Sequence, residues 1–219
     1  SGESHDSIEA SATPQSSLQT YLNFDESRGT TANDSTGNGW NGTLVNGPTW
    51  VTGYSNNAVN LSGSSQYVTL PAGVVSNLND FTITAWVKPV TLADWMRIFD
   101  FGTGTGVYMF LSPQNGASHT LRFAITTTGN GGEQQINSSS TLSLNTWHHV
   151  AVTLNGSVGI LYLDGVPVGT NSTMTLNPSN LGVTTQNYIG KSQYNSDPYL
   201  NGQVDEFRIY SRALSPGEV

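Results

Sequence analysis

Two short segments of the chain combine charged, amide and aromatic side chains that could bind a small polar ligand. Arg97 and Asp100 stand among apolar residues in the segment 95–100, and the segment 191–199 is rich in amide, acidic and aromatic residues. Planar polar side chains bind hydroxyl groups well, and an aromatic ring can cover the C–H face of a sugar. We therefore predict a pocket for a neutral sugar, formed by Arg97, Asp100, Glu133, Lys191, Gln193, Asp197 and Tyr199.

A structural role for these charges is the alternative. Arg97, Asp100, Glu133 and Lys191 could form an ion-pair network that only holds loops together. A third alternative is that some of these ion pairs are structural and others contact the ligand. We expect Arg122 and Glu133 to come from strands of one sheet, which would bring both of them near the predicted pocket.

Closely spaced carboxylates on one strand, of the kind that hydrolyse glycosidic bonds, are missing from the sequence, although a pair that is distant in sequence stays open. Such enzymes use one acid together with one nucleophile or base, and neither Glu-x-Asp-x-x-Glu nor Glu-x-Asp-x-Glu occurs in the chain. Asp205 and Glu206 are adjacent, so on a strand they face opposite ways. His148 and His149 are adjacent as well and cannot bind one metal from the same face, so we expect one inward, hydrogen-bonded histidine and one at the surface. We predict no catalytic residue.

Four oxygen-bearing side chains could hold a structural calcium ion, because calcium prefers hard oxygen ligands: Asp25, Asp34, Asn38 and Asp205. Asp205 has the strand parity of Phe207, which predicts an inward carboxylate in need of a partner. The alternative is that Asp34 and Asn38 form an Asx turn and that Asp205 pairs with an arginine.

Alternating apolar and polar residues indicate β-strands over much of the chain. The alternation is clear over residues 81–87 and 121–126, and turn signals recur every 8 to 12 residues or so, a spacing typical of a β-sandwich. Asn155-Gly156 and Asp164-Gly165 predict two tight hairpins of type I′. Trp86 and Trp147 lie in strand patterns and are expected in the core. Trp40 and Trp50 are expected to pack beside the candidate calcium loop.

The two ends of the chain differ from its middle. Residues 1–17 are small and polar without an apolar period, and we interpret them as a linker or an expression remnant. The domain is predicted to cover residues 18–219. The last residues, 214–219, are typical of a first helical turn, which suggests a module taken from a longer protein.

Composition narrows the possible partners. The net charge is −8, and the seven basic residues are scattered, so the chain has no basic stripe for nucleic acid or for an anionic membrane surface. It contains no cysteine, which excludes disulfides and thiolate metal sites. We expect a secreted, extracellular and bacterial protein that works as a monomer.

A series of motifs in fixed order resembles a known family. The motifs are the segment 22–26, the loop 34–39, and the segments 81–87, 147–152, 161–165 and 204–210. Together they are similar to the laminin-G-like, concanavalin-A-like jelly roll, whose bacterial members are commonly appended to secreted glycoside hydrolases. The segments 97–102, 132–135 and 189–200 are similar to one subgroup of these modules.

The resemblance implies an all-β, two-sheet antiparallel jelly-roll sandwich with a calcium ion near the N-terminal loop. It also implies a non-catalytic carbohydrate-binding module that directs a secreted polysaccharide-degrading enzyme to its glycan. The alternative is an extracellular adhesion or protein-interaction module of the same fold, because one fold hosts many functions.

Overall fold

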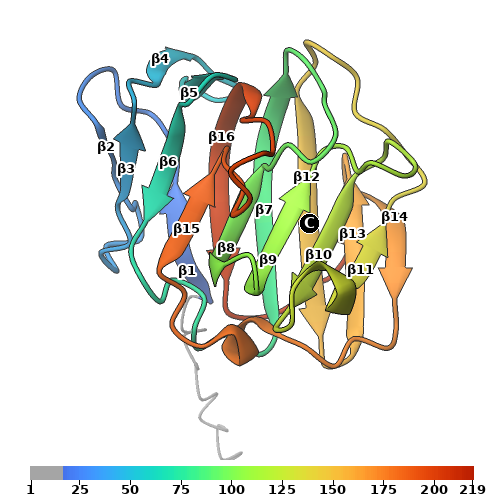
Figure 1. Ribbon diagram of the computed structural model, residues 1–219. Coiled ribbons are helices and arrows are strands. Elements are labelled where there is room, and N and C mark those ends of the chain that lie inside the picture. Colours follow the sequence, from blue (N-terminus) through green and yellow to red (C-terminus); the bar gives the residue numbers. More distant parts are fainter. Residues whose placement is uncertain (1–16) are drawn as a thin grey trace, which may run out of the picture.

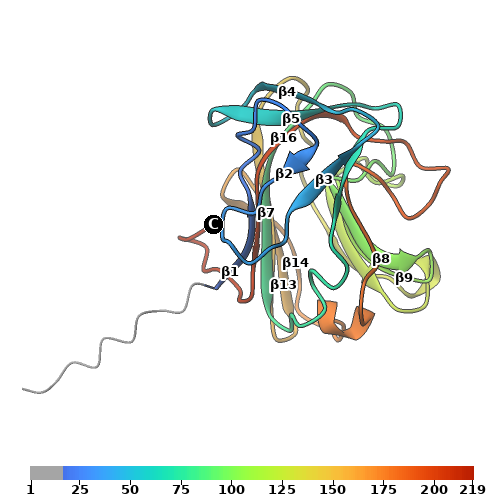
Figure 2. The ribbon, with the colours of Figure 1, turned by 90° about the vertical axis from the view of Figure 1, so that its left-hand side faces the viewer.

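Two antiparallel β-sheets packed face to face form the molecule. The computed structural model describes residues 17–219, so the predicted linker lies outside the described residues except for Ser17. Figure 1 looks onto one sheet, and Figure 2 shows the edge of the sandwich, with β7 (Phe81–Pro89) in one layer and β8 (Phe99–Gly104) in the other. The predicted all-β antiparallel sandwich is confirmed.

Each sheet contains eight strands within the described part of the chain. Sheet A has the order β14 (Val166–Asn171), β13 (Val158–Leu163), β12 (His148–Asn155), β7, β16 (Asn201–Tyr210), β5 (Asn57–Ser62) and β4 (Thr49–Thr52), and β1 (Leu18–Leu22) also pairs with β16. Sheet B has the order β11 (Gln134–Asn137), β10 (Arg122–Thr126), β9 (Val107–Ser112), β8, β15 (Gln186–Ile189), β6 (Tyr67–Leu70), β3 (Gly42–Val45) and β2 (Thr31–Ala32).

Two short 3₁₀ helices complete the described chain, η1 (Asn130–Gly132) and η2 (Pro178–Leu181). No helix in residues 17–219 has the length and apolar character needed to span a membrane.

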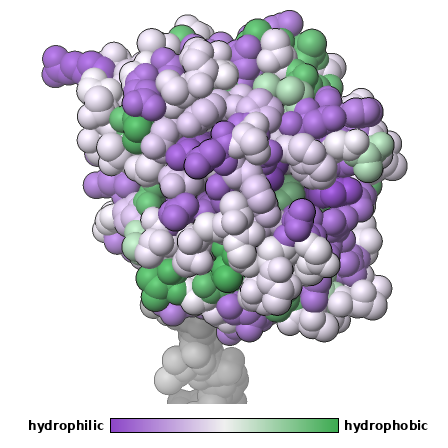
Figure 3. Space-filling model, viewed as in Figure 1, coloured by the Kyte–Doolittle hydropathy of each residue, from purple (hydrophilic) through white to green (hydrophobic). Residues whose placement is uncertain are grey.

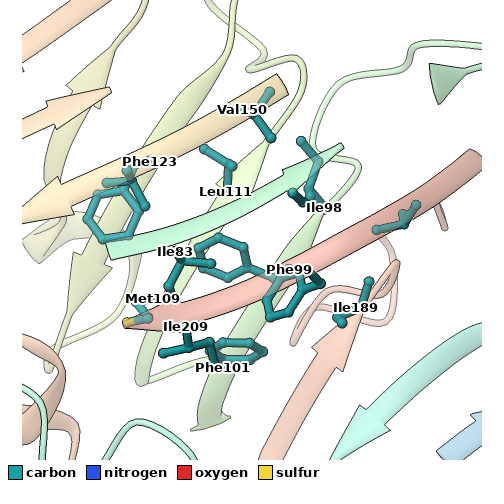
Figure 4. Packing of buried hydrophobic residues seen from close by; sticks show 14 of the residues in the cluster. Ile83, Ile98, Phe99, Phe101, Met109, Leu111, Phe123, Val150, Ile189 and Ile209 are labelled. Atoms are coloured by element: carbon teal, nitrogen blue, oxygen red, sulfur yellow. The ribbon is translucent and has the colours of Figure 1, made fainter. Parts of the chain in front are cut away.

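The core lies between the sheets and follows the period-two pattern of the sequence. Ile83 and Ile209 of sheet A meet Phe99, Phe101 and other apolar side chains of sheet B in this layer (Figure 4). The rings of Phe99 and Phe101 stack with their centroids 5.0 Å apart, and Phe207 meets both of them edge-on. This aromatic cluster lies beneath the strand that carries Asp100, so core packing fixes the strand on which the candidate site is built.

The two predicted hairpins differ in outcome. Asp164 and Gly165 have φ angles of 52° and 77°, as a type I′ turn requires, and they connect β13 to β14 as predicted. The other turn lies one residue later than predicted. Asn155 pairs with Val158, so the two-residue loop is Gly156-Ser157, and only Gly156 needs a positive φ.

Trp86 and Trp147 are not in the core, which corrects the sequence prediction. Trp86 alternates with the inward residues Ala85 and Val87, so its ring lies on the outer face of sheet A and is partly exposed. Tyr54 stacks on the Trp86 ring with a centroid distance of 3.5 Å, and Trp147 meets Tyr54 edge-on at 6.3 Å. By contrast, Trp40 and Trp50 are half-buried against the core as expected.

A β-bulge in β16 reverses the predicted direction of Asp205. The register shifts between Asp205 and Arg208, and Glu206 has a φ of 53°. Asp205 lies opposite Trp86, so its carboxylate is on the outer side of sheet A and not in the core. It is fully buried because the turn of residues 53–56 covers it and donates the Tyr54 and Ser55 N–H groups to it.

Truncating Phe101 tests the importance of the aromatic cluster. We expect Phe101→Ala to lower the free energy of unfolding by about 3–5 kcal/mol, because it removes a fully buried ring and leaves a cavity. Denaturant unfolding followed by circular dichroism measures this loss. Val183→Ala at an exposed position is the control and should change stability by no more than about 0.5 kcal/mol. Equal effects of the two substitutions would contradict the packing argument.

Candidate functional site

A hollow of about 360 Å³ lies on the outer face of sheet B, over β8 to β11. We call it the sheet B hollow, and its lining residues are Trp95, Arg97, Tyr108, Arg122, Asn130, Glu133, Gln135, Tyr194 and Asp197. Figure 3 shows the molecule from this side, where hydrophilic side chains are spread over much of the face. Tyr108 and Arg122 reach this face because they alternate with the core residues Met109 and Phe123 on their strands.

Arg97 is the buried anchor of the sheet B hollow. Its Nε donates to Asp100 Oδ2 at 3.1 Å, its Nη2 donates to Asp197 Oδ2 at 3.1 Å, and its Nη1 donates to the Trp95 carbonyl at 2.6 Å. The guanidinium also lies over the Phe110 ring, 3.9 Å from the ring centroid. These contacts come from separate segments of the chain, so Arg97 fixes the loops that border the hollow.

Asp100 lies beneath the hollow and is completely buried. Burial raises the pKa of its carboxyl to about 7, and this effect outweighs the opposing effects of Arg97 and of the hydrogen bonds from Gln193. The Oδ1 atom has no hydrogen-bond partner, whereas Oδ2 accepts bonds from Arg97 and from the Gln193 N–H. An oxygen without a donor is consistent with a carboxyl that holds its proton more tightly than usual.

Glu133 and Arg122 also line the hollow. Glu133 accepts hydrogen bonds from the Tyr108 hydroxyl at 2.7 Å and from Gln135 Nε2 at 2.8 Å. Arg122 uses its Nε to donate to Asn137 Oδ1, and its guanidinium carbon lies 5.4 Å from the centroid of the Trp95 ring. Burial lowers the pKa of Arg122 and raises that of Tyr108. Within residues 17–219, the two terminal nitrogens of Arg122 form no hydrogen bond, so they are free to donate to a ligand.

The seven predicted binding residues occupy three environments. Arg97, Glu133 and Asp197 line the sheet B hollow, whereas Asp100 and Gln193 lie beneath it and hold its walls. Lys191 and Tyr199 lie in a separate aromatic cluster. There the Lys191 Nζ is 4.8 Å and 4.5 Å from the ring centroids of Tyr67 and Tyr188, and Tyr199 contacts Tyr67.

The predicted set omitted several residues of the hollow, including Tyr108, Asn130 and Gln135. Strand alternation could have found Tyr108, since it has the same outward parity on β9 as Phe110 and Ser112. Asn130 belongs to η1, a single short turn without a periodic pattern, so no signal in the sequence pointed to it.

The four predicted metal ligands do not converge on one point. Asp34 closes its own loop by accepting hydrogen bonds from the N–H groups of Tyr21, Thr36 and Trp40, and these bonds lower its pKa against the opposing effect of burial. The side-chain amide of Asn38 donates to the Gln19 carbonyl. Within residues 17–219, no three His, Asp or Glu side chains are grouped to hold a metal ion.

Asp25 and Asp205 do approach one turn from two sides. Asp25 accepts hydrogen bonds from Asn56 and Asn57, and Asp205 accepts them from Tyr54 and Ser55. A Cβ atom added to Gly53 would lie 2.4 Å from the Asn57 carbonyl oxygen and 2.6 Å from Asp205 Oδ2. A carbonyl and a carboxylate oxygen therefore face the same small space, which is the ligand chemistry that calcium uses.

A serine, a histidine and an aspartate form a hydrogen-bonded chain at the start of β12. Ser143 Oγ lies 2.8 Å from His148 Nε2, and His148 Nδ1 lies 2.8 Å from Asp164 Oδ2, the order of a hydrolase triad. However, the Ser143 backbone N–H also donates to Nε2 at 3.1 Å. The unprotonated nitrogen of a neutral imidazole has one lone pair with which to accept hydrogen bonds. The ring thus links the loop before β12 to the β13–β14 turn through its two nitrogens.

The two antiparallel sheets packed face to face define a jelly-roll β-sandwich domain. Residues 62–219, well over half of the chain, match the family described as the concanavalin A-like lectin/glucanases superfamily, in its laminin-G-like group. The chain belongs to this superfamily, and the predicted resemblance is confirmed. A comparison with curated protein sequences gives no match.

Several solved structures share the fold. Domain 4 of AbnA, a GH43 extracellular arabinanase from Geobacillus stearothermophilus solved in complex with arabinotriose, is 24% identical, with a TM-score of 0.79 over 92% of this chain and 95% of that domain. The binding domain of Paraclostridial Mosquitocidal Protein 1 is 20% identical, with a TM-score of 0.67 over 92% of this chain and 50% of that chain. Trypanosoma rangeli sialidase is 18% identical, with a TM-score of 0.67 over 92% of this chain and 32% of that chain. At these identities the likeness shows a shared fold.

The pKa of Asp100 predicts an unusual pH dependence of stability. Its pKa of about 7 in the folded state exceeds the ordinary value of 3.8, so its favourable contribution is present below pH 4 and is lost as the pH rises toward 7. Relative to Asp100→Asn, which stays neutral, the wild type should lose roughly 1–4 kcal/mol of unfolding free energy between pH 4.5 and 7.5. Denaturant unfolding of both proteins across this range measures the difference in slope, whatever constant offset the substitution causes. Parallel pH profiles would contradict the raised pKa.

Proposed function

We propose that the domain is a non-catalytic carbohydrate-binding module of a secreted polysaccharide-degrading enzyme, and that it binds an oligosaccharide in the sheet B hollow as a monomer. The observation that carries this proposal is the free terminal end of the Arg122 guanidinium beside the Trp95 ring, in a hollow that Glu133 also lines. A fork of donors, an acceptor and an aromatic surface in one hollow are the groups that bind sugar hydroxyls and C–H faces.

The size of the hollow favours a short ligand. Its volume of about 360 Å³ is near the lower end of the range for small-molecule sites. We therefore propose that it binds a chain end or a side-chain sugar such as arabinose or galactose. The arabinotriose complex of the similarly folded arabinanase domain supports a pentose among the first ligands to test.

The two carboxylates that line the hollow are held in fixed positions by hydrogen bonds from protein groups. Glu133 accepts from Tyr108 and Gln135, and Asp197 accepts from Arg97 and from the Ser192 hydroxyl. A glycosidase needs one carboxyl group to deliver a proton and a second to act as nucleophile or base. Here both carboxylates are occupied by fixed donors, which supports binding without hydrolysis.

Removing the free donors of the hollow should weaken binding. We expect Arg122→Ala to reduce affinity for arabinotriose or soluble arabinan at least about tenfold, since it removes a charge-assisted donor pair worth more than about 1.4 kcal/mol. Isothermal titration calorimetry and affinity gel electrophoresis measure the change, with galactan and xylan as further ligands. Arg28→Ala, at an exposed position away from the hollow, is the matched control and should bind like the wild type.

Two results would contradict the proposed function. One is a folded wild-type domain that binds none of these glycans. The other is the release of reducing sugar from any of them by the purified domain.

We also propose a structural calcium ion at the turn of residues 53–57, with Asp205 and Asp25 as the acidic ligands and the Asn57 carbonyl as a third oxygen donor. Asp34 and Asn38 lie outside this set because Asp34 is held within its own loop and the Asn38 side chain is bonded to β1 at the Gln19 carbonyl, away from the turn of residues 53–57. Bound there, the ion would neutralise the buried Asp205 carboxylate and would join the loop after β1, the turn before β5 and the bulge of β16.

Chelation tests the calcium proposal. A ligand that binds only the folded state stabilises it by mass action, by about 2.7 kcal/mol when its concentration is 100 times its Kd. We expect the melting temperature to rise on adding calcium to the EDTA-treated domain, and Asp205→Asn to abolish this rise. Asp34→Asn is the control: it should destabilise the domain but keep the response to calcium. A wild-type melting temperature that is the same with and without calcium would exclude the site.

A further inference from the structure

A second hollow lies on the opposite side of the sandwich, on the outer face of sheet A. Its volume is about 440 Å³, and it is lined by Trp86, His149, Asp164, Gly165, Arg208 and Val219. These residues come from β7, β12, the β13–β14 turn, β16 and the end of the chain. We call it the sheet A hollow. It shares no residue with the sheet B hollow.

The aromatic side of the sheet A hollow is fixed by stacking. Tyr54 lies parallel to Trp86, with an interplanar angle of 12°, and His149 lies on the neighbouring strand with its ring centroid 5.3 Å from that of Trp86. Tyr54 remains 51% exposed although it stacks on Trp86. A ligand would therefore meet aromatic side chains that already have one orientation, which lowers the entropic cost of binding.

The polar groups of this hollow are also held before any ligand arrives. Arg208 pairs with Glu206, and its guanidinium lies 4.3 Å from the Tyr21 ring centroid. Asp164 accepts from the His149 N–H and from His148, yet its side chain is 49% exposed. A donor fork and an acceptor carboxylate thus face one space, each supported by its own neighbours.

The mixture of charges selects the class of ligand. Arg208 alone would favour an anion, but Asp164 borders the same hollow and Glu206 pairs with Arg208, so a second negative charge would be repelled. Burial, helped by Arg208, lowers the pKa of His149, so its ring is neutral near pH 7 and can both donate and accept. Hydroxyl groups, which do both, match these partners, and the Trp86 side chain adds an apolar surface to the lining of the hollow.

We propose that the sheet A hollow is a second binding site for a neutral saccharide, so that one domain can bind glycan on both faces of its sandwich. A polysaccharide surface offers many copies of the same sugar. Two sites on one rigid domain would then raise the affinity for the polymer above that for a short oligosaccharide, without any further contact.

Fluorine NMR of the domain labelled with 5-fluorotryptophan tests the second site directly. The chain has 5 tryptophans, of which Trp95 borders the sheet B hollow and Trp86 borders the sheet A hollow, so each site has its own reporter. Arabinotriose, galactobiose, xylotriose and cellotriose are the probes. With at least one of them, we expect the Trp86 resonance to shift and saturate in the wild type and equally in Arg122→Ala. Arg208→Lys keeps the charge but loses the fork, and should weaken the Trp86 response about tenfold while leaving that of Trp95 unchanged.

The outcomes separate this inference from the proposed function. A shift of Trp95 without any shift of Trp86 overturns the second site and leaves the first intact. A Trp86 shift that disappears in Arg122→Ala also overturns it, because the effect would then come from the sheet B hollow. A Trp86 shift that persists in Arg122→Ala supports the second site, whether or not Trp95 responds.

Discussion

A buried guanidinium determines the layout of the sheet B face. The side chain of Arg97 is only 3% exposed, and moving an isolated charge out of water costs several kcal/mol unless it is paired and hydrogen-bonded. Its partners are a strand residue, Asp100, and two loop groups, the Trp95 carbonyl and the Asp197 carboxylate. The loops before β8 and after β15 must therefore keep one arrangement, and the hollow that they border is formed without a ligand. The core rings of Phe99 and Phe101, on either side of Asp100 in β8, hold that strand in place.

The two arginines of this face serve different purposes. Arg97 donates its hydrogen bonds to protein groups, as expected if the charged residues have a structural role. Arg122 lines the hollow and uses only its Nε in this way, so its remaining nitrogens have no protein partner within residues 17–219. The contacts of Arg97 thus agree with the structural alternative, whereas ligand binding at this face stays a prediction. A site of this kind obtains its rigidity from satisfied charges and its affinity from the few groups that remain unsatisfied.

Much of the fold could be predicted because its signals are local and periodic. The alternation over residues 81–87 places Ile83 and Val87 in the core, and Asp164-Gly165 forms the predicted turn. The site could be predicted only in part. Lys191 and Asp197 are close in sequence but lie in different clusters, because the loop after β15 turns between them. The predicted inward direction of Asp205 was wrong because β16 contains a bulge. In this bulge Glu206 has a φ of 53°, although glutamate has no preference for positive φ. Strand parity cannot reveal such a bulge in advance.

That single irregularity in β16 organises the outer face of sheet A. It turns Asp205 outward, and the buried carboxylate then needs donors, which the Tyr54 and Ser55 N–H groups supply. These bonds hold the turn that carries Tyr54, whose ring stacks on Trp86, and Trp86 borders the second hollow. The proposed calcium ion and the proposed second saccharide site therefore share one structural element, the turn of residues 53–57. Both proposals therefore depend on the hydrogen bonds that hold this turn against the Asp205 carboxylate. The bulge of β16 thus does for the outer face of sheet A what Arg97 does for that of sheet B: a buried charge in need of partners fixes a loop beside a hollow.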